Sequence, residues 1–110
     1  GVMDEAEFQR GVREAEADIA RERCRLFFQT RGSWGERFTD LMRDRFGVQV
    51  VHISDITWDA KTSYERGYNS TVRSHIDATH GAGSYDSAWQ EIQAYRQESY
   101  RKWLASQENA

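Results

Sequence analysis

Apolar side chains recur every three or four residues along most of this chain, which has 110 residues and no proline. This spacing is typical of amphipathic helices, and without proline nothing interrupts them. We therefore predict an all-α, mostly helical fold, with four helices in a four-helix bundle-like single domain that covers residues 1–110. Because the joints between the helices are short, we expect consecutive helices to run antiparallel.

The first predicted helix extends from about Asp4 to Thr30 and carries one narrow apolar seam. The alternating spacing of the seam gives it the width of a coiled-coil contact. The charged residues Glu22 and Arg23 interrupt it near its end. Such a break either sets the register between paired helices or shows that the helix has turned toward a second apolar face. The seam consists of Phe8, Val12, Ala15, Ile19 and Leu26.

The second predicted helix begins at Ser33, where Ser33 and Glu36 have the spacing of a capping box, and ends at Gly47. From residue 48 the apolar period changes to two and β-branched residues accumulate, which indicates an extended, strand-like segment near residues 48–53. A lone strand has no partner in an otherwise helical chain. We expect this segment either to lie on the helices as an extended connector or to pair with a second copy of the protein.

The third predicted helix begins at Asp55 or Thr57, ends at Gly81 and has Gly67 in its interior. A glycine there costs about 1 kcal/mol relative to alanine, which raises the question of close packing between backbones. The fourth predicted helix begins at Ser84, after a glycine-rich joint, and its apolar face is rich in aromatic residues. That face contains Tyr85, Ala88, Trp89, Ile92, Tyr95, Tyr100 and Trp103.

The composition excludes several classes of protein. The 15 basic and 18 acidic residues nearly cancel, and 4 Trp and 5 Tyr supply apolar area, so the chain is expected to fold. No apolar run approaches the roughly 20 residues that cross a bilayer, and no signal-peptide pattern is present, so we expect a soluble, cytoplasmic protein that does not associate with membranes. The single cysteine, Cys24, excludes an internal disulfide and a cysteine-based zinc site.

Several arginines of the first predicted helix lie within about a third of its circumference, as a nucleic-acid-binding stripe would. Acidic residues share this arc at the i,i+3 and i,i+4 offsets that pair opposite charges. We therefore expect a solvated surface of ion pairs and no binding to nucleic acid. The arginines are Arg10, Arg13, Arg21 and Arg25, and the acids are Glu7, Glu14, Asp18 and Glu22.

The three histidines, His52, His75 and His80, suggest a comparison with metal sites. His75 and His80 lie roughly 140° apart around a helix, whereas a shared metal usually takes ligands at i,i+3 or i,i+4. We therefore expect no metal and no cofactor. A nucleophilic pair of Cys24 and His75 would lack an orienting group and an oxyanion donor, so we identify no catalytic residues.

Two polar residues occupy positions where an apolar core needs none. His75 lies on the apolar face of the third predicted helix, either as a hydrogen-bonded core histidine or as a pocket group that titrates near neutral pH. Arg96 lies within the aromatic face of the fourth, as a cation–π partner, an oligomer contact or an anion-binding group. A ligand pocket between these two helices would be lined by His75, Arg96, Tyr64, Tyr68 and Trp89.

These features favour a non-catalytic protein-interaction or regulatory accessory module that acts as a homo-oligomer, most simply a homodimer, with a further protein partner left open. The narrow seam, the strand-like segment without a partner and the surplus of aromatic residues each indicate self-association. The alternative is a binding protein or enzyme for a small, anionic ligand that uses the pocket described above. The expected interface residues are Phe8, Val12, Ile19, Val50 and Trp103.

Overall fold

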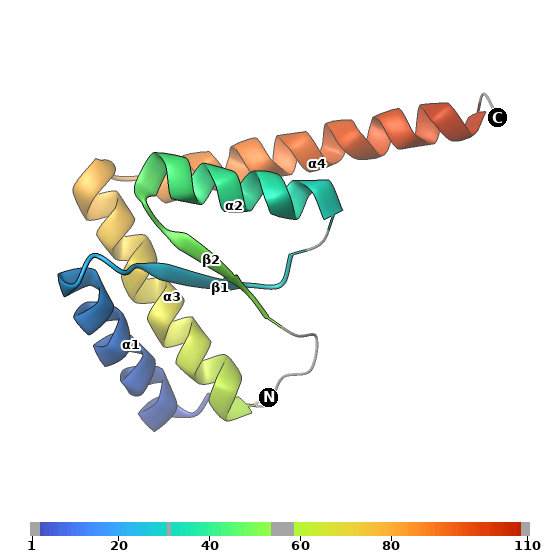
Figure 1. The fold of residues 1–110 in the computed structure, drawn as a ribbon. Helices are drawn as coiled ribbons and strands as arrows, with labels where there is room; N and C mark the ends of the chain where they lie inside the picture. Colours follow the sequence, from blue (N-terminus) through green and yellow to red (C-terminus); the bar gives the residue numbers. More distant parts are fainter. Residues whose placement is uncertain (1–2, 31, 54–58, 109–110) are drawn as a thin grey trace.

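The computed structural model describes residues 3–30, 32–53 and 59–108, which form four helices and two short strands (Figure 1). The expected mostly helical class is confirmed. The last three expected helices correspond to α2, α3 and α4, although the expected start of the third lies outside the described residues. In chain order the elements are α1 (Glu5–Ala20), β1 (Arg25–Phe28), α2 (Gly32–Phe46), β2 (Gln49–His52), α3 (Asp59–His80) and α4 (Ser84–Glu108).

The expectation of a long first helix is wrong beyond Ala20, where α1 ends and a tight turn leads into β1. Glu22 takes a left-handed backbone conformation, with φ of 58°. The amides of Glu22 and Arg23 donate to the carbonyl oxygens of Ile19 and Asp18, at 3.0 and 2.8 Å. This is the hydrogen-bond pattern of a Schellman motif, which ends a helix. The charged interruption of the seam therefore marks the end of α1.

The two strands pair with each other in parallel, with Leu26 of β1 opposite Val50 of β2, and α2 is the crossover between them. Parallel strands need such a crossover because each must begin at the same end of the sheet. Both expectations for residues 48–53 are therefore wrong. The segment is neither a connector nor half of an intermolecular ribbon, since its partner is β1 of the same chain.

One side chain of α3 closes the outer edge of β1. The Phe27 amide donates to Asn69 Oδ1 at 2.9 Å, and Asn69 Nδ2 donates to the Phe27 carbonyl oxygen at 2.9 Å. These two bonds satisfy peptide groups that a third strand would otherwise pair. The sheet therefore ends at β1 on this side.

The sheet separates the helices into two pairs, so they do not form a single four-helix bundle (Figure 1). On one side, with α1 and α3, the Phe27 ring lies 5.1 Å from Tyr68 between centroids. On the other, with α2 and α4, Phe28 lies 4.9 Å from Phe38 and 5.8 Å from Trp89. Neighbouring strand residues point to opposite faces of a sheet, which is why Phe27 and Phe28 meet different helix pairs.

α1 and α3 run in the same direction and cross with their backbones in contact (Figure 1). A Cβ atom on Gly67 would lie 2.0 Å from the Phe8 carbonyl oxygen, and one on Gly11 would lie 2.1 Å from that of Tyr64. Only glycine leaves room for this crossing. The glycine in the interior of α3 therefore does mark close packing between backbones.

α2 and α4 run antiparallel on the other side of the sheet (Figure 1). Arg45, near the end of α2, forms an ion pair with Glu91 in the middle of α4. Trp34, at the start of α2, lies beside Arg96, which is further along α4. α2 ends as expected at Gly47, which has a φ of 67°. The direction of α2 thus decides which part of α4 it covers.

Candidate interaction surface

α4 is longer than the helix that it packs on, and its last turns project from the body of the molecule (Figure 1). α2 begins at Gly32, and its first turn meets α4 through hydrogen bonds between Tyr95 and Ser33. The Tyr95 hydroxyl also bonds Ser99, and these two contacts lower the pKa of Tyr95. Beyond this point every residue from 101 to 108 is exposed.

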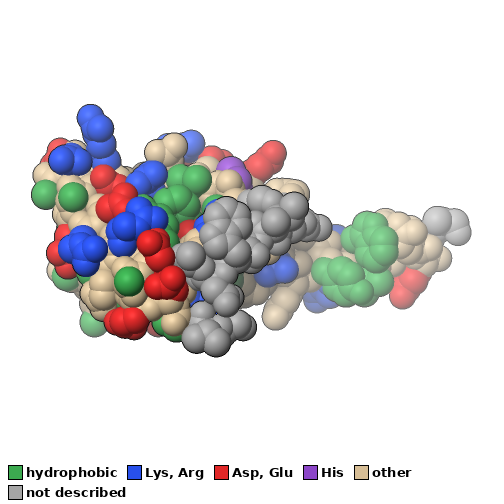
Figure 2. Space-filling view, turned by 90° about the horizontal axis from the view of Figure 1, so that it is seen from below, with side chains coloured by type: hydrophobic (Ala, Val, Ile, Leu, Met, Phe, Trp, Pro, Cys, Tyr) green, Lys and Arg blue, Asp and Glu red, His purple; other side chains and the backbone are tan. Residues whose placement is uncertain are grey.

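The projecting end presents the same face of α4 that packs inside the body. Trp103 follows Tyr85 by about five helical turns, so both lie on one side of the helix. Tyr85 is 4% exposed, whereas Trp103 is 55%, Tyr100 62% and Leu104 41% exposed. The Tyr100 and Trp103 rings stack with centroids 6.0 Å apart, and Figure 2 shows hydrophobic side chains gathered on the projecting end. An apolar face suited to packing therefore continues into solvent.

A groove of about 410 Å³ lies where this exposed face meets the start of α2. Trp34 forms one wall, and the Arg96 guanidinium lies 4.5 Å from the centroid of its ring. Trp34 also contacts Trp89 edge-on, at 6.4 Å between centroids. A guanidinium stacked on an indole keeps its charge in water and extends the flat surface of the ring. The groove is lined by Ser33, Trp34, Gln93, Arg96, Gln97, Ser99 and Tyr100.

The groove and the exposed rings form one continuous surface on α4. Its residues lie three, four and seven positions on either side of Tyr100, which places them on one side of the helix, as in a helix that pairs with another helix. Arg96 is its one charged member, and Glu98 and Arg101 pair with each other away from it. We call this surface the distal α4 face. It consists of Gln93, Arg96, Gln97, Tyr100, Trp103, Leu104 and Gln107.

The structure does not bring together the five residues expected to line a ligand pocket. Tyr64 and Tyr68 lie on the α1 side of the sheet, with ring centroids 6.2 Å apart. Trp89 and Arg96 lie on the other side, where both contact the first turn of α2. His75 is half-buried on α3, about two turns beyond Tyr68. Of these five, Arg96 alone is among the described residues that line the groove.

The five residues expected at an intermolecular interface also differ in their surroundings. Val50 is 6% exposed and belongs to the core. Phe8, Val12 and Ile19 are half-buried on α1, which packs on α3 of the same chain. Trp103 is the member of the set that remains largely exposed. The seam and the strand are thus satisfied within one chain, and the aromatic surplus is the indication of self-association that persists.

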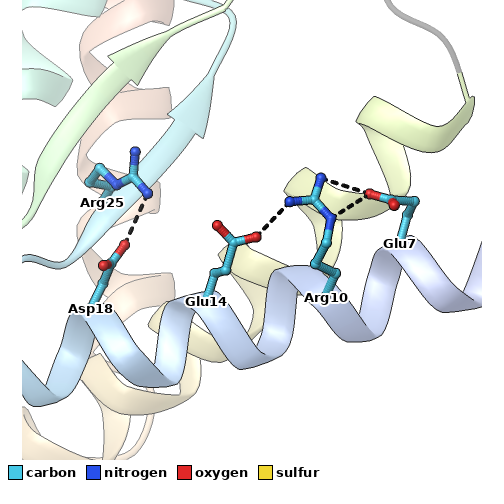
Figure 3. Close-up of polar contacts among 5 residues, drawn as sticks. All are labelled: Glu7, Arg10, Glu14, Asp18 and Arg25. Atoms are coloured by element: carbon cyan, nitrogen blue, oxygen red, sulfur yellow. Dashed lines mark hydrogen bonds and ion pairs between the residues drawn. The ribbon is translucent and has the colours of Figure 1, made fainter.

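A polar cluster joins α1, β1 and α3 on the other side of the sheet. Figure 3 shows its ion pair between Asp18 of α1 and Arg25 of β1. The Tyr68 hydroxyl donates to Asp18 Oδ2 at 2.6 Å, and Arg25 donates to the same oxygen at 2.9 Å. The hydrogen bond from Tyr68, aided by Arg25, lowers the pKa of Asp18. Burial, followed by the bond to Asp18, raises the pKa of Tyr68 to about 12. These groups satisfy one another, so we assign the cluster to the stability of the fold.

A pocket of about 520 Å³ beside this cluster includes Cys24, the one cysteine of the chain. Burial raises the pKa of the Cys24 thiol. The thiol therefore stays protonated at neutral pH, whereas the thiolate is the nucleophilic form. Charges of both signs line the pocket, through Asp18, Glu22, Arg23 and Arg25. This environment does not activate a nucleophile.

The exposed face of α1 carries the ion pairs expected from its sequence (Figure 3). Arg10 lies 2.8 Å from a carboxylate oxygen of Glu7 and 2.6 Å from one of Glu14. These pairs form at i,i+3 and i,i+4 and leave little net charge on the face. The prediction of a surface laced with opposite charges is confirmed here.

Trp89, Arg96 and Trp103 were predicted from the sequence as site residues, whereas the position of Trp34 as a wall of the groove was not predicted. Trp34 has the spacing of an ordinary core residue, and its position beside Arg96 depends on the antiparallel packing of α2 and α4. The difference in length between the second and fourth predicted helices could have indicated that part of the aromatic face stays exposed. A helix of 15 residues cannot cover one of 25, so part of the aromatic face of α4 had to remain open.

Comparisons with protein-family models, with curated protein sequences and with solved structures each find no match. Among the described residues, no helix is long and apolar enough to span a membrane. The same residues contain no group of three or more His, Cys, Asp or Glu side chains that could hold a metal ion. Function is therefore inferred from the surface chemistry of the chain itself.

Proposed function

We propose that this protein is a protein-interaction module that binds its partner through the distal α4 face. The observation that supports this most directly is the exposure of Tyr100 and Trp103 on a helix that projects from the body. Large aromatic side chains bury much area at a small cost in conformational entropy, and they are enriched at interfaces. A partner that covered them would remove this apolar area from water.

The groove beside Trp34 supports the same function. It adjoins the exposed rings, so one partner could fill the groove and cover the rings together. The alternative, a small-ligand pocket between α3 and α4, has less support because its five expected residues lie on both sides of the sheet. Binding through the distal α4 face needs no reactive group, in keeping with a regulatory or accessory role.

A variant that replaces three exposed side chains tests this function: Tyr100→Ser, Trp103→Ser and Leu104→Ser together. We expect the variant to fold with the thermal midpoint of the dissociated unsubstituted protein, because these side chains lie outside the core. We expect native mass spectrometry to show association in the unsubstituted protein and none in the variant. The matched control is the double variant Glu98→Ala and Arg101→Ala, which alters the other side of the same helix. It should associate normally.

Two results would contradict the proposed function. The first is a thermal midpoint of the triple variant about 10 °C or more below that of the dissociated unsubstituted protein, which corresponds to a loss of well over 1 kcal/mol and would make the three side chains structural. The second is a Trp103 side chain that acrylamide fails to quench in the dissociated protein, where we expect it to be accessible. The Trp103 signal is obtained by subtracting the fluorescence of W103F, and a shielded Trp103 would mean that the face is not open.

A further inference from the structure

We infer that the partner of the distal α4 face is a second copy of this chain, whose α4 packs antiparallel across a two-fold axis near Tyr100. This inference rests on the proposed function, because it names the partner of the same surface. It uses one property of that surface: the distal α4 face carries both a groove and the side chains that could fill one.

The groove and the exposed rings are placed so that two copies can exchange them. Arg96, beside the groove, and Trp103 lie on the same side of α4 and roughly 10 Å apart along it. With a two-fold axis at Tyr100, Trp103 of one copy lies opposite Gln97 of the other, and Leu104 lies opposite Arg96. Each copy then places its indole against the groove of the other. Such reciprocal contacts define an isologous interface.

The spacing of the distal α4 face is symmetric about the same residue. Counting outward from Tyr100, Gln93 and Gln107 are each seven residues away, so they meet across the axis in the antiparallel pair. Residues at three and four positions on either side also face the other copy. One antiparallel register therefore brings every position of the face into use, as in a short coiled coil.

The charges on the face are compatible with this pairing. The face contains no acidic residue, and its one charged side chain, Arg96, is stacked on Trp34 of its own chain. In the antiparallel register the two Arg96 residues lie roughly 12 Å apart along the helices, beyond the Debye length at physiological salt. Glu98 and Arg101 are already paired with each other away from the face. Two copies thus meet without close repulsion between like charges.

The area available favours a reciprocal contact over a single one. Tyr100, Trp103 and Leu104 are 62%, 55% and 41% exposed. Because large side chains have about 150–250 Å² of surface, these fractions amount to roughly 300 Å² on each copy. In a reciprocal contact both copies bury these side chains, so the three side chains alone contribute roughly 600 Å² to the interface, twice what a single contact would take from them.

Cysteine cross-linking in solution tests the geometry, in the 110-residue protein that carries Cys24→Ser. Tyr100→Cys places a thiol on the axis, so a short bismaleimide should join two copies into a covalent dimer. Lys102→Cys is the matched control: it is two residues from the axis but on the other side of the helix, and it should give no covalent dimer. Gln93→Cys and Gln107→Cys should each fail alone and should cross-link when the two variants are mixed.

Two cross-linking results would overturn the inference. One is a Lys102→Cys variant that cross-links as readily as Tyr100→Cys, because the distal α4 face would then not be the contact. The other is a mixture of Gln93→Cys and Gln107→Cys that gives no product although Tyr100→Cys does, because the helices would then not be antiparallel. The second result leaves the proposed function intact, because the distal α4 face would still be the contact; the first removes self-association as support for it.

Sedimentation equilibrium tests the energetics. We expect the dissociation constant of the dimer to rise by at least about 30-fold in Trp103→Ala, as for a central aromatic anchor. Trp103→Phe should have a smaller effect, and Glu98→Ala should have none. Equal circular dichroism spectra and thermal midpoints of the dissociated variants would show that the fold is unchanged. An unaltered dissociation constant in Trp103→Ala would overturn the inference.

The failure of this inference can be told apart from the failure of the proposed function. A protein that stays monomeric at all concentrations, with Trp103 open to acrylamide, overturns the dimer and leaves the distal α4 face open for another protein. A monomer that sediments with phosphatidylglycerol vesicles overturns the dimer and also the proposed function, because the face would then bind a lipid surface and not a protein. A monomer with Trp103 shielded overturns both the dimer and the proposed function.

Discussion

At Gly67, the absence of a side chain decides how closely α1 and α3 pack. Alanine is the better helix former by about 1 kcal/mol, so propensity alone favours it at this position. The structure reverses that preference, because a Cβ atom at Gly67 would lie 2.0 Å from the Phe8 carbonyl oxygen. A single residue thus controls the distance between two helices.

We expect Gly67→Ala to lower the free energy of unfolding by about 2–3 kcal/mol, since the two backbones must separate to admit the methyl group. Urea unfolding followed by circular dichroism measures this change. The matched control is Ser70→Ala, at an exposed position on the same helix, which should change the stability by less than about 0.5 kcal/mol. A Gly67→Ala protein as stable as the control would show that the crossing is wider than described.

The Tyr68 hydroxyl is expected to act on stability through Asp18. Tyr68→Phe keeps the ring but removes the donor to the Asp18 carboxylate, so we expect a loss of about 1–2 kcal/mol at neutral pH and a higher pKa for Asp18. The pKa of Asp18 is lowered in the folded protein, so its stabilisation is present above about pH 4 and is lost as pH falls through the folded pKa. The difference from the unsubstituted protein should therefore shrink in acid. Urea unfolding at neutral and acidic pH measures it, and a difference independent of pH would exclude Asp18 as the cause.

At the scale of elements, the end of α1 decides the architecture. The Schellman motif at Glu22 stops the helix and releases β1, which then becomes the partner of β2. The left-handed conformation is sterically unfavourable for glutamate, because its Cβ atom crowds the backbone, but not for glycine. The turn therefore persists because β1 is held between β2 and α3, with Asn69 closing its outer edge.

Glycine at residue 22 distinguishes this turn from a continuous helix. We expect Glu22→Gly to raise the free energy of unfolding by up to about 1 kcal/mol, because glycine adopts the left-handed conformation without strain. The control is Glu16→Gly, at an exposed position inside α1, which should lower it by about 1 kcal/mol. Both values follow from chemical denaturation. Destabilisation of similar size in both variants would mean that the helix continues through residue 22.

The projecting end of α4 is expected to be the least stable part of the helices. It makes few tertiary contacts, and short helical segments without them are marginal in water. We expect amides 101–108 to exchange with solvent far faster than those around Ile92, which is fully buried. Hydrogen-exchange mass spectrometry at two protein concentrations measures this. Protection of residues 101–108 should rise with concentration if association covers them, and the W103A variant should show no rise.

At the scale of the whole molecule, the sheet separates two pairs of helices whose packing differs. The α1 and α3 half is tied together by glycine contacts and by the cluster at Asp18. The α2 and α4 half leaves one helix partly uncovered. The stable half supports the rest of the fold, and the uncovered helix is available for a partner.

Thermal stability should depend on protein concentration. A dimer that forms only from folded chains stabilises the fold by mass action, so we expect the midpoint of thermal unfolding to rise with concentration. W103A should remove this dependence, and its midpoint should equal that of the unsubstituted protein at high dilution. Differential scanning calorimetry over a wide concentration range measures both. A midpoint independent of concentration in the unsubstituted protein would contradict self-association.

Much of the helical structure followed from local sequence. The starts of α2 and α4, the ends of α2 and α3, and the ion pairs of α1 depend on residues within one or two turns of each other. The apolar spacing near Gln49–His52 also indicated an extended segment correctly. Arg25–Phe28 was wrongly predicted to be helical, because its short apolar run continues the helical spacing of the preceding residues although it forms a strand.

The sequence by itself determined most of the helical segments and the aromatic face of α4, because helical periodicity is a local property. Only the tertiary structure decided that β1 pairs with β2, that Gly67 meets Phe8, and that α2 leaves the end of α4 uncovered. These features join residues far apart in the chain, and one local pattern is compatible with several such pairings. The surface proposed for binding also depends on tertiary structure. It exists because α2 is shorter than α4 and packs against only part of it, and local sequence patterns do not specify how two helices pack.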